Sequence, residues 1–532
     1  MEPTDRPSLP DPAAGYDAVA STTGASVLRG ALWNGVVRLL PPIYTLVQSV
    51  VAARYLGTAG MGRQSYIAFV ETIVTLALTG GLPIALLRYV GQLRGEGAQS
   101  SVRALVRWAW RLELLGAGLG GAVVLVVGLS RHELRGAWSL AAVACVASIL
   151  HTVPYAVLAG IQRWRDAGIV GLVTGFVSTV ATVVVLRLGG GITGMFVVEA
   201  TVSVVTLVGT SLLALRAMTV LGPAEAALSP ELRGVVRRYA GFTTFQVVLA
   251  SIVAQRSEFF FLDHYSTPTQ IALYSVPFGV VSAAARLPES LGSVFVPAVA
   301  TLFGAGQHER IRVGYLRAVR LLTMLALPLS AILLASGPTL VELLYGRDYR
   351  RSGAILMVIA CTLPMIPMAT VTKALLEGLG RKAAVVSVLV VATVVNLVSA
   401  ELLVPAHGAM GAAIANTAAQ LASALMLLTL GARVMGPYEW DRLRLLSATI
   451  SVVAGGVLMR IVIAGLGGGA VGLVVGVAVG SAVMLAGAVS LRVIGPDDAE
   501  WLAGVLGGRP TLARVVLRLS GGLRGDSRDR RR

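Results

Sequence analysis

Charged side chains are scarce in this chain of 532 residues. Only 13% of the residues are Asp, Glu, Lys or Arg, about half the share of an ordinary soluble domain. Apolar residues make up 55% of the chain, and the mean hydropathy is +0.78. So few charges cannot cover the aqueous surface of a chain this long. The composition excludes a soluble enzyme, a nucleic-acid-binding protein, a fibrous protein and a disordered chain, and it indicates a polytopic membrane protein.

Lysine and cysteine are rarer still. Of 44 basic residues only Lys373 and Lys382 are lysine, and the net charge is +17. In a membrane protein such an excess of arginine is typical of cytosolic loops that face anionic lipid, so we expect no nucleic-acid partner. The two cysteines, Cys145 and Cys361, lie in apolar stretches. There they fit buried hydrophobic residues better than a disulfide or metal ligands.

The N-terminus lacks the pattern of a secretory signal, which is a basic start followed directly by a short apolar core. Its first ~25 residues are polar and proline-rich, with Asp5, Asp11 and Asp17 ahead of any apolar run. We therefore expect residues 1–28 to form a disordered tail in the cytosol. The arginine-rich C-terminal segment, residues 496–532, is expected to form a basic tail on the same side.

Long apolar runs fill the chain between these tails. A helix needs roughly 20 residues to cross the hydrocarbon core of a bilayer, and fourteen runs reach about that length. The fold class is therefore an all-α polytopic membrane protein with about fourteen transmembrane helices, at 31–53, 65–87, 108–129, 138–159, 166–186, 192–215, 239–262, 271–300, 316–336, 353–372, 383–403, 409–431, 446–464 and 470–491.

The basic residues between these runs predict the orientation. With the N-terminus inside, nineteen arginines and lysines fall in inner loops, among them Arg94 and Arg312, and eight fall in outer loops, among them Arg131. This bias follows the positive-inside rule. An even number of helices then places both termini in the cytosol, and we expect a multi-pass protein of the bacterial cytoplasmic membrane.

Chemical motifs are missing from the chain. No metal-ligand cluster, nucleotide-binding loop or nucleophile arrangement occurs in the sequence, and no loop between helices is long enough for a catalytic domain. We therefore expect a protein that is not an enzyme, needs no cofactor and binds no metal as a cofactor.

Several phrases in the second half resemble a known transporter family. They are LLYGRDY at 343–349, LEGLGR at 376–381 and LVPAHGAMGAAIA at 403–415. Pro405 in the last phrase predicts the end of a helix, and Gly408, Gly411 and their neighbours predict close helix packing. Together with ARYLG at 53–57 and IALYSV at 271–276, these phrases form a series over roughly residues 30–430. The series resembles the polysaccharide-transporter branch of the multidrug/oligosaccharidyl-lipid/polysaccharide exporter superfamily, whose members are flippases for polyprenyl-pyrophosphate-linked sugars.

The resemblance implies an N-terminal lobe of helices 1–6 at 29–220 and a C-terminal lobe of helices 7–12 at 221–436, with helices 13 and 14 appended at 437–495. Many transporters build two alternating-access states from such repeats. The implied activity is translocation of a lipid-linked oligosaccharide or cell-wall precursor. The implied partners are that polyprenyl-pyrophosphate-linked glycan, membrane lipid and glycan-assembly enzymes, and we expect a monomer.

Arginines inside the predicted helices are candidates for binding the substrate. A charge at the centre of a membrane helix costs about 2.5–3.5 kcal/mol, so it should face a cavity or a partner. Arg38 lies near the middle of the first helix with Asn34 one turn before it, Arg54 ends that helix, and Arg256 lies in the seventh. A guanidinium binds phosphate oxygens in a bidentate manner. An ion pair of Arg38 with an acid such as Glu71 is the structural alternative.

Three acids in the predicted helices, Glu71, Glu199 and Glu258, are candidates for ion coupling. Two other functions stay open for the chain. One is a cation-coupled multidrug exporter of the same superfamily, which would need acidic cavity residues; the other is a membrane glycan ligase or transferase, which would usually need a large catalytic loop. A scaffold without transport activity is a further possibility.

Overall fold

The structure is a computed structural model that describes residues 24–131, 133–219, 228–254, 257–292, 302–438 and 442–491, together with residues 299, 493 and 495; the side chains of 24–39, 253–254 and 287–292 lie outside this description. Residues 41–493 form one compact unit. All contacts reported below lie within residues 41–493.

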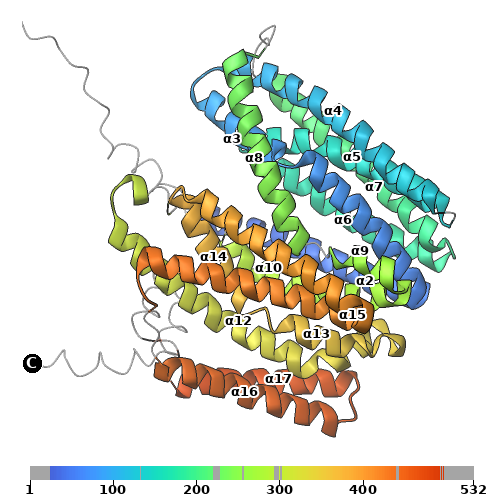
Figure 1. The fold of residues 1–532 in the computed structure, drawn as a ribbon, viewed down its shortest axis with the longest axis vertical. Coiled ribbons are helices and arrows are strands. Elements are labelled where there is room, and N and C mark those ends of the chain that lie inside the picture. Colours follow the sequence, from blue (N-terminus) through green and yellow to red (C-terminus); the bar gives the residue numbers. More distant parts are fainter. Residues whose placement is uncertain are drawn as a thin grey trace, which may run out of the picture. The chain divides into compact units, whose positions relative to one another are not determined.

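The described residues contain helices and no strand (Figure 1). In the N-terminal part, α4, α5 and α7 pack side by side, and α3 packs on α4 and α5. The helices of this part are α2 (Gly24–Thr79), α3 (Leu82–Gly95), α4 (Gln99–Ser130), α5 (Arg135–Gly160), α6 (Trp164–Arg187) and α7 (Gly191–Met218).

The C-terminal part is built around two long helices, α12 and α15. The helix pair α16 and α17 packs on α12, and α8 contacts both α3 and α15. The helices of this part are α8 (Pro230–Ala254), α9 (Glu258–Tyr265), α10 (Pro268–Gly292), α12 (His308–Tyr345), α13 (Ser352–Ala360), α14 (Met365–Gly378), α15 (Lys382–Met435), α16 (Arg442–Gly465) and α17 (Ala470–Ser490), with a short 3-10 helix, η2 (Arg347–Tyr349), after α12.

The apolar nature of the helices confirms a polytopic membrane protein. Among the described residues, eight helices are long and apolar enough to cross a membrane, or ten if each of two bent helix pairs is one span. This number counts α15 once, although its 54 residues extend about twice as far as one crossing requires. Two of the predicted spans, 383–403 and 409–431, lie in this helix. The total of fourteen spans remains a prediction.

Glycines divide the two longest helices between predicted spans. The backbone leaves helical geometry at Gly57 in α2, with φ 66°, and at Gly408 in α15, with φ 52°. Both values lie in the left-handed region. A residue with a Cβ adopts this conformation only at a cost in free energy, whereas glycine adopts it at almost no cost. The helix end predicted at Pro405 is wrong by a few residues, because α15 continues through Pro405 and breaks at Gly408.

Close packing follows this break. A Cβ at Gly411 would lie 2.3 Å from the Leu403 carbonyl oxygen, so only glycine allows the two segments this approach. The prediction of close packing at Gly411 is thus confirmed. Ala412, Ala413 and Ala415 are buried beside it, as expected for an interface of small residues.

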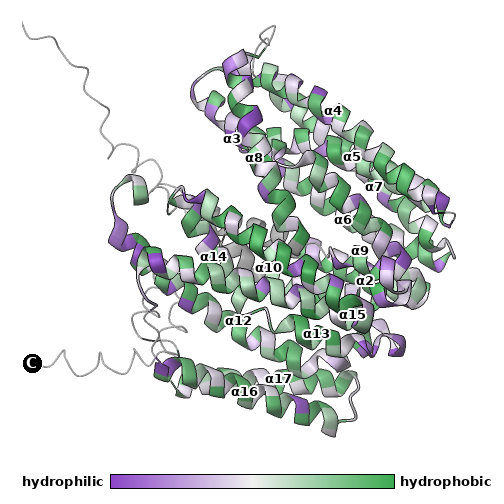
Figure 2. Ribbon diagram, viewed as in Figure 1, coloured by the Kyte–Doolittle hydropathy of each residue, from purple (hydrophilic) through white to green (hydrophobic). Residues whose placement is uncertain are grey.

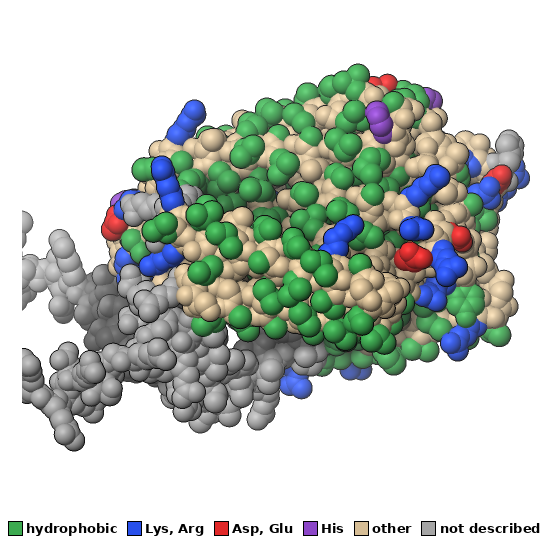
Figure 3. All heavy atoms as spheres, turned by 90° about the horizontal axis from the view of Figure 1, so that it is seen from below, with side chains coloured by type: hydrophobic (Ala, Val, Ile, Leu, Met, Phe, Trp, Pro, Cys, Tyr) green, Lys and Arg blue, Asp and Glu red, His purple; other side chains and the backbone are tan. Residues whose placement is uncertain are grey.

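Large apolar side chains cover the outside of the helices. Leu115 and Val126 of α4 are 73% and 64% exposed, and Val471 of α17 is 71% exposed. Hydrophobic residues run along the helices while hydrophilic ones gather near their ends (Figure 2). In the space-filling view most basic side chains lie toward the edges of a largely apolar face (Figure 3). Such a surface is stable in a bilayer and not in water.

Candidate functional site

The structure describes only part of the predicted substrate site. Arg38 and Asn34 lie in α2, but their side chains fall outside the described residues, and Arg256 lies outside them entirely. The assignment of these residues to the substrate therefore stays a prediction.

Arg54 is described, and its guanidinium binds the end of another helix. Its Nε donates to the Leu344 carbonyl at 2.7 Å and its Nη2 to the Leu343 carbonyl at 2.5 Å. Both carbonyls lie in the last turn of α12, where backbone acceptors lack helical partners and a positive charge complements the helix dipole. In this conformation Arg54 therefore joins the predicted N-terminal lobe to the predicted C-terminal lobe.

A second contact between the predicted lobes lies at the same end of the bundle, which the arginine distribution predicts to be outside. Arg131 donates to the Asp263 carboxylate through both terminal nitrogens, at 2.7 and 2.5 Å. These hydrogen bonds raise the pKa of Arg131 above its usual value. The guanidinium also lies 4.7 Å from the ring centroid of Tyr66. This bidentate pair joins the end of α4 to α9.

Two further contacts accompany this pair. The Ser65 hydroxyl donates to that of Ser275 at 3.3 Å, and both residues are buried. The Tyr349 hydroxyl donates to the Gly57 carbonyl at 3.2 Å. Together with Arg54 and the Arg131–Asp263 pair, these contacts form the "outer clasp" between the predicted lobes.

Glu258 lies in the best-defined polar cluster of the described residues. Its carboxyl group is fully buried. Asn396 and Asn416 donate to Oε1 at 2.6 and 2.9 Å, and the Tyr274 hydroxyl donates to Oε2 at 3.0 Å. Each hydrogen bond to a charged group contributes about 1.5–3 kcal/mol. Three neutral donors thus stabilise a carboxylate within the bilayer region.

The two asparagine amides direct their NH2 groups to Glu258 and use their oxygens for other partners. The Ser257 hydroxyl lies 2.9 Å from Asn396 Oδ1, and Gln420 Nε2 lies 2.5 Å from Asn416 Oδ1. A cation beside this carboxyl group would face amide N–H donors rather than free oxygen ligands. The sequence analysis selected Glu258 from this cluster. It missed Asn416, whose signal is an asparagine within the apolar run at 409–431.

Glu71 and Glu199 meet in the predicted N-terminal lobe. Glu71 is buried on α2, its carboxyl group contacts that of Glu199 on α7, and Ser148 of α5 also hydrogen-bonds to it. A hydrogen bond between two carboxyl groups requires that one of them carries a proton. This arrangement can therefore hold and release a proton. Unlike Glu258, the pair is not stabilised by several amide donors.

Glu113 is a buried acid that the sequence analysis missed. The Thr152 hydroxyl lies 3.5 Å from its Oε1, and within the described residues its Oε2 has no hydrogen-bond partner. Glu113 lies within the apolar run at 108–129, and its charge in that run was the signal that should have identified it.

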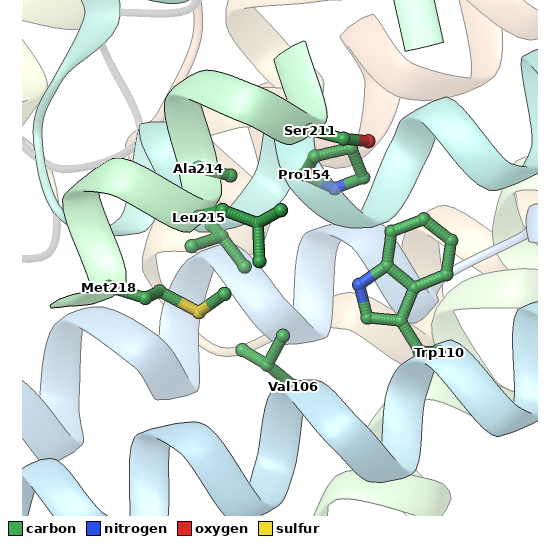
Figure 4. A pocket seen from close by; sticks show the side chains of 8 residues that line it. Val106, Trp110, Pro154, Ser211, Ala214, Leu215 and Met218 are labelled. Carbon is green, nitrogen blue, oxygen red and sulfur yellow. The ribbon is translucent and has the colours of Figure 1, made fainter. Parts of the chain in front are cut away.

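A small cavity of about 110 Å³ lies between α4, α5 and α7 (Figure 4). Trp110, Pro154, Ser211 and Met218 are among its lining residues, and no lining residue is charged. Because a pyrophosphate needs cationic or multiple N–H partners, this apolar cavity does not fit the headgroup of the expected substrate.

Two family models match the chain. The model of the lipid II flippase MurJ matches residues 271–479, and that of a polysaccharide biosynthesis protein matches residues 129–354. The chain is similar in fold to the lipid II flippase MurJ in an inward closed conformation, with 13% identity and a TM-score of 0.66, over 86% of this chain and 98% of that chain. The two family models and this shared fold together support the resemblance to the multidrug/oligosaccharidyl-lipid/polysaccharide exporter superfamily.

Other solved members of this superfamily share the fold. An inward-facing multidrug resistance transporter of the MATE family has 15% identity and a TM-score of 0.64, over 75% of this chain and 98% of that chain. A superfamily transporter from Pyrococcus furiosus, described as having a binding pocket of reversed polarity, has 16% identity and a TM-score of 0.54, over 79% of this chain and 99% of that chain. A comparison with curated protein sequences finds no match.

Proposed function

We propose that the chain is a flippase that moves a polyprenyl-pyrophosphate-linked oligosaccharide or cell-wall precursor from the cytosolic to the outer leaflet by alternating access. The match of residues 271–479 to the lipid II flippase family is the observation that carries this proposal. The protein acts in the cytoplasmic membrane of a bacterium as a monomer, with both termini in the cytosol. Glycan-assembly enzymes supply its substrate.

The substrate site in this proposal uses the arginines of the two lobes, 29–220 and 221–436. Arg38 and Arg256 hold the pyrophosphate, Asn34 adds a hydrogen bond, and Arg54 binds the headgroup once the outer clasp opens. Cationic side chains suit an anionic headgroup because each guanidinium binds two phosphate oxygens.

Coupling in this proposal uses the buried acids. Glu258 and the Glu71–Glu199 pair take part in ion coupling, and the pair holds a proton that is released as the lobes rearrange. The membrane potential contributes as well, because outward movement of an anion down an inside-negative potential releases about 2.3 kcal/mol per charge per 100 mV.

A cation-coupled multidrug exporter is the second candidate. The fold similarity to a multidrug resistance transporter supports it. A cationic drug would need free acids in the cavity, whereas three of the described acids pair with each other or bind neutral donors: Glu71, Glu199 and Glu258. The flippase is therefore favoured.

Depletion of the protein in its host cells tests the function. We expect a lipid-linked glycan to accumulate on the cytosolic leaflet, without increased sensitivity to cationic drugs. Re-expression of the wild type should restore the outer-leaflet pool. Unchanged glycan lipids together with new sensitivity to cationic drugs would favour the multidrug exporter and contradict the flippase.

Alanine variants of Arg38 and Arg256 test the substrate site. Each substitution should remove a contact of about 1.5–3 kcal/mol and abolish glycan export at normal protein abundance, and lysine should restore export only in part. If either arginine is instead an ion-pair partner, abundance should fall, and changing the paired acid to glutamine should restore it. Normal export by both variants would reject the site.

A further inference from the structure

Two cations from the two predicted lobes share one aromatic ring at the end of the bundle predicted to be cytosolic. The guanidinium carbon of Arg88, on α3, lies 4.9 Å from the ring centroid of Tyr239, on α8. The Lys382 ammonium, at the start of α15, lies 5.1 Å from the same centroid. The two charges are therefore at most about 10 Å apart.

The ring itself is held in place. Tyr239 packs perpendicular to Tyr89 of α3, with centroids 5.9 Å apart and an interplanar angle of 88°, and Arg88 also lies 5.5 Å from the Tyr89 centroid. The faces of aromatic rings attract cations. Contact with both rings thus fixes where the guanidinium lies, and contact with Tyr239 fixes where the ammonium lies.

Within the described residues, neither Arg88 nor Lys382 has a carboxylate within 4 Å. Other basic residues at this end are engaged. Arg94 donates to the Ile161 carbonyl at 2.7 Å, Arg103 donates to the Met218 carbonyl, and Lys373 lies 4.0 Å from Glu377. Arg88 is exposed and Lys382 is half-buried, so an external ligand can reach both.

Two like charges at this separation repel each other, and the ring compensates only part of that repulsion. The first turn of α15 contains no acidic residue that would offset the ammonium. An anion between the two cations would remove the repulsion and use the fork of the guanidinium and the point charge of the ammonium together. A pyrophosphate, with two adjacent charged phosphoryl groups, matches two separated cations better than a singly charged phosphodiester.

We propose that Arg88, Lys382 and Tyr239 form a capture site for the pyrophosphate of a polyprenyl-linked substrate at the cytosolic leaflet. This inference rests on the proposed function and adds a first binding step before the central site. Because the cations belong to different predicted lobes, the bound anion links the lobes at this end. Neither residue is among the substrate candidates that the sequence provided.

Binding of polyprenyl pyrophosphate to the full chain in phosphatidylcholine nanodiscs tests the capture site. We expect Arg88→Gln and Lys382→Gln each to weaken binding about tenfold, the factor that corresponds to one lost contact to a charged group. Arg310→Gln is the matched control, since Arg310 is a basic residue of a predicted cytosolic loop that binds only Gln307 among the described residues. It should bind as the wild type does.

Substitutions of the ring separate a binding role from a structural one. Tyr239→Phe keeps the aromatic face and should bind normally, whereas Tyr239→Leu should weaken binding with the same thermal midpoint as the wild type. Lys382→Arg should retain affinity because it keeps the charge. A loss of affinity in the glutamine variants that is matched by a lower thermal midpoint, and is not restored by Lys382→Arg, would overturn the proposal.

Competition for binding by three ligands shows which class of molecule the capture site prefers. Polyprenyl pyrophosphate should compete strongly, and phosphatidylglycerol and inorganic pyrophosphate only weakly. Equal competition by phosphatidylglycerol would overturn the proposal in favour of general lipid binding, and equal competition by inorganic pyrophosphate would overturn it in favour of a soluble ligand. Normal binding by both glutamine variants would overturn the capture site alone, whereas a wild type that never binds polyprenyl pyrophosphate would contradict the proposed function.

Discussion

The two ends of the bundle use their basic residues differently. At the predicted outer end, Arg54 and Arg131 bind acceptors across the lobes, two backbone carbonyls and the Asp263 carboxylate. At the predicted cytosolic end, Arg88 and Lys382 approach each other over Tyr239, and within the described residues neither has a carboxylate partner. Satisfied charges stabilise one arrangement of two lobes, whereas charges without partners are available to a ligand. We infer that the outer clasp holds the lobes together at the predicted outer end, whereas the proposed capture site would bind an anion at the predicted cytosolic end.

A disulfide across the outer clasp should have the largest effect. Ser65→Cys and Ser275→Cys place two sulfurs where the hydroxyls lie 3.3 Å apart, a separation from which a disulfide can form. Oxidation should stop translocation completely and reversibly, because alternating access requires this contact to open. Each single-cysteine variant under the same oxidant is the control. Undiminished transport by the cross-linked protein would show that this end does not open.

Cysteine labelling of intact cells tests which end is outside. Cysteines at Arg131 and Asp348 should react with a membrane-impermeant reagent, whereas cysteines at Arg94 and Arg312 should react only after the cells are lysed. Arginine enrichment is typical of cytosolic loops. Reaction at position 312 in intact cells would reverse the assignment of the two ends.

Loss of the Asp263 carboxylate should open the outer clasp in part. Asp263→Ala leaves the half-buried Arg131 without its bidentate acceptor, and we expect a stability loss of about 1–3 kcal/mol. The double exchange of Arg131 to Asp and Asp263 to Arg should recover part of it. Thermal unfolding in detergent measures both. Equal stability of the single variant and the wild type would mean that the pair does not hold the clasp.

Arg54→Gln should have the smallest effect. Arg54 is exposed, so solvent screens its hydrogen bonds to the end of α12, and we expect a stability loss of at most about 1 kcal/mol. If Arg54 also binds the headgroup, export should decline more than stability does. A loss of stability as large as that of Asp263→Ala would show that the hydrogen bonds from Arg54 to the end of α12 are a main element of the outer clasp.

The sequence predicts the helices well because each one must be apolar over a sufficient length. The run at 138–159 lies within α5, and the run at 166–186 lies within α6. The breaks were harder to predict. A proline removes one backbone hydrogen bond from a helix, yet α15 continues through Pro405. The helix breaks instead at Gly408, where φ is 52°, a value that glycine alone adopts freely.

The site was only partly predictable, because its contacts join distant parts of the chain. Glu258 stands out locally as a charge in an apolar run, but its donors Asn396 and Asn416 lie 138 and 158 residues away. The meeting of Arg88 and Lys382 over Tyr239 likewise depends on how α3, α8 and α15 pack. Arg131 was expected in an outer loop, but no local pattern reveals that it pairs with Asp263.

Translocation by the purified protein in liposomes tests the central claim most directly. A fluorescent polyprenyl-pyrophosphate-linked sugar is placed in both leaflets, and an impermeant reductant quenches the label in the outer leaflet at time zero. Liposomes with the wild type should renew the outer pool, and faster under an imposed potential that favours anion movement in that direction. Liposomes with the oxidised Ser65→Cys/Ser275→Cys variant should match empty ones. If liposomes with folded wild-type protein renewed the outer pool no faster than empty liposomes do, under any imposed gradient, this result would contradict the account.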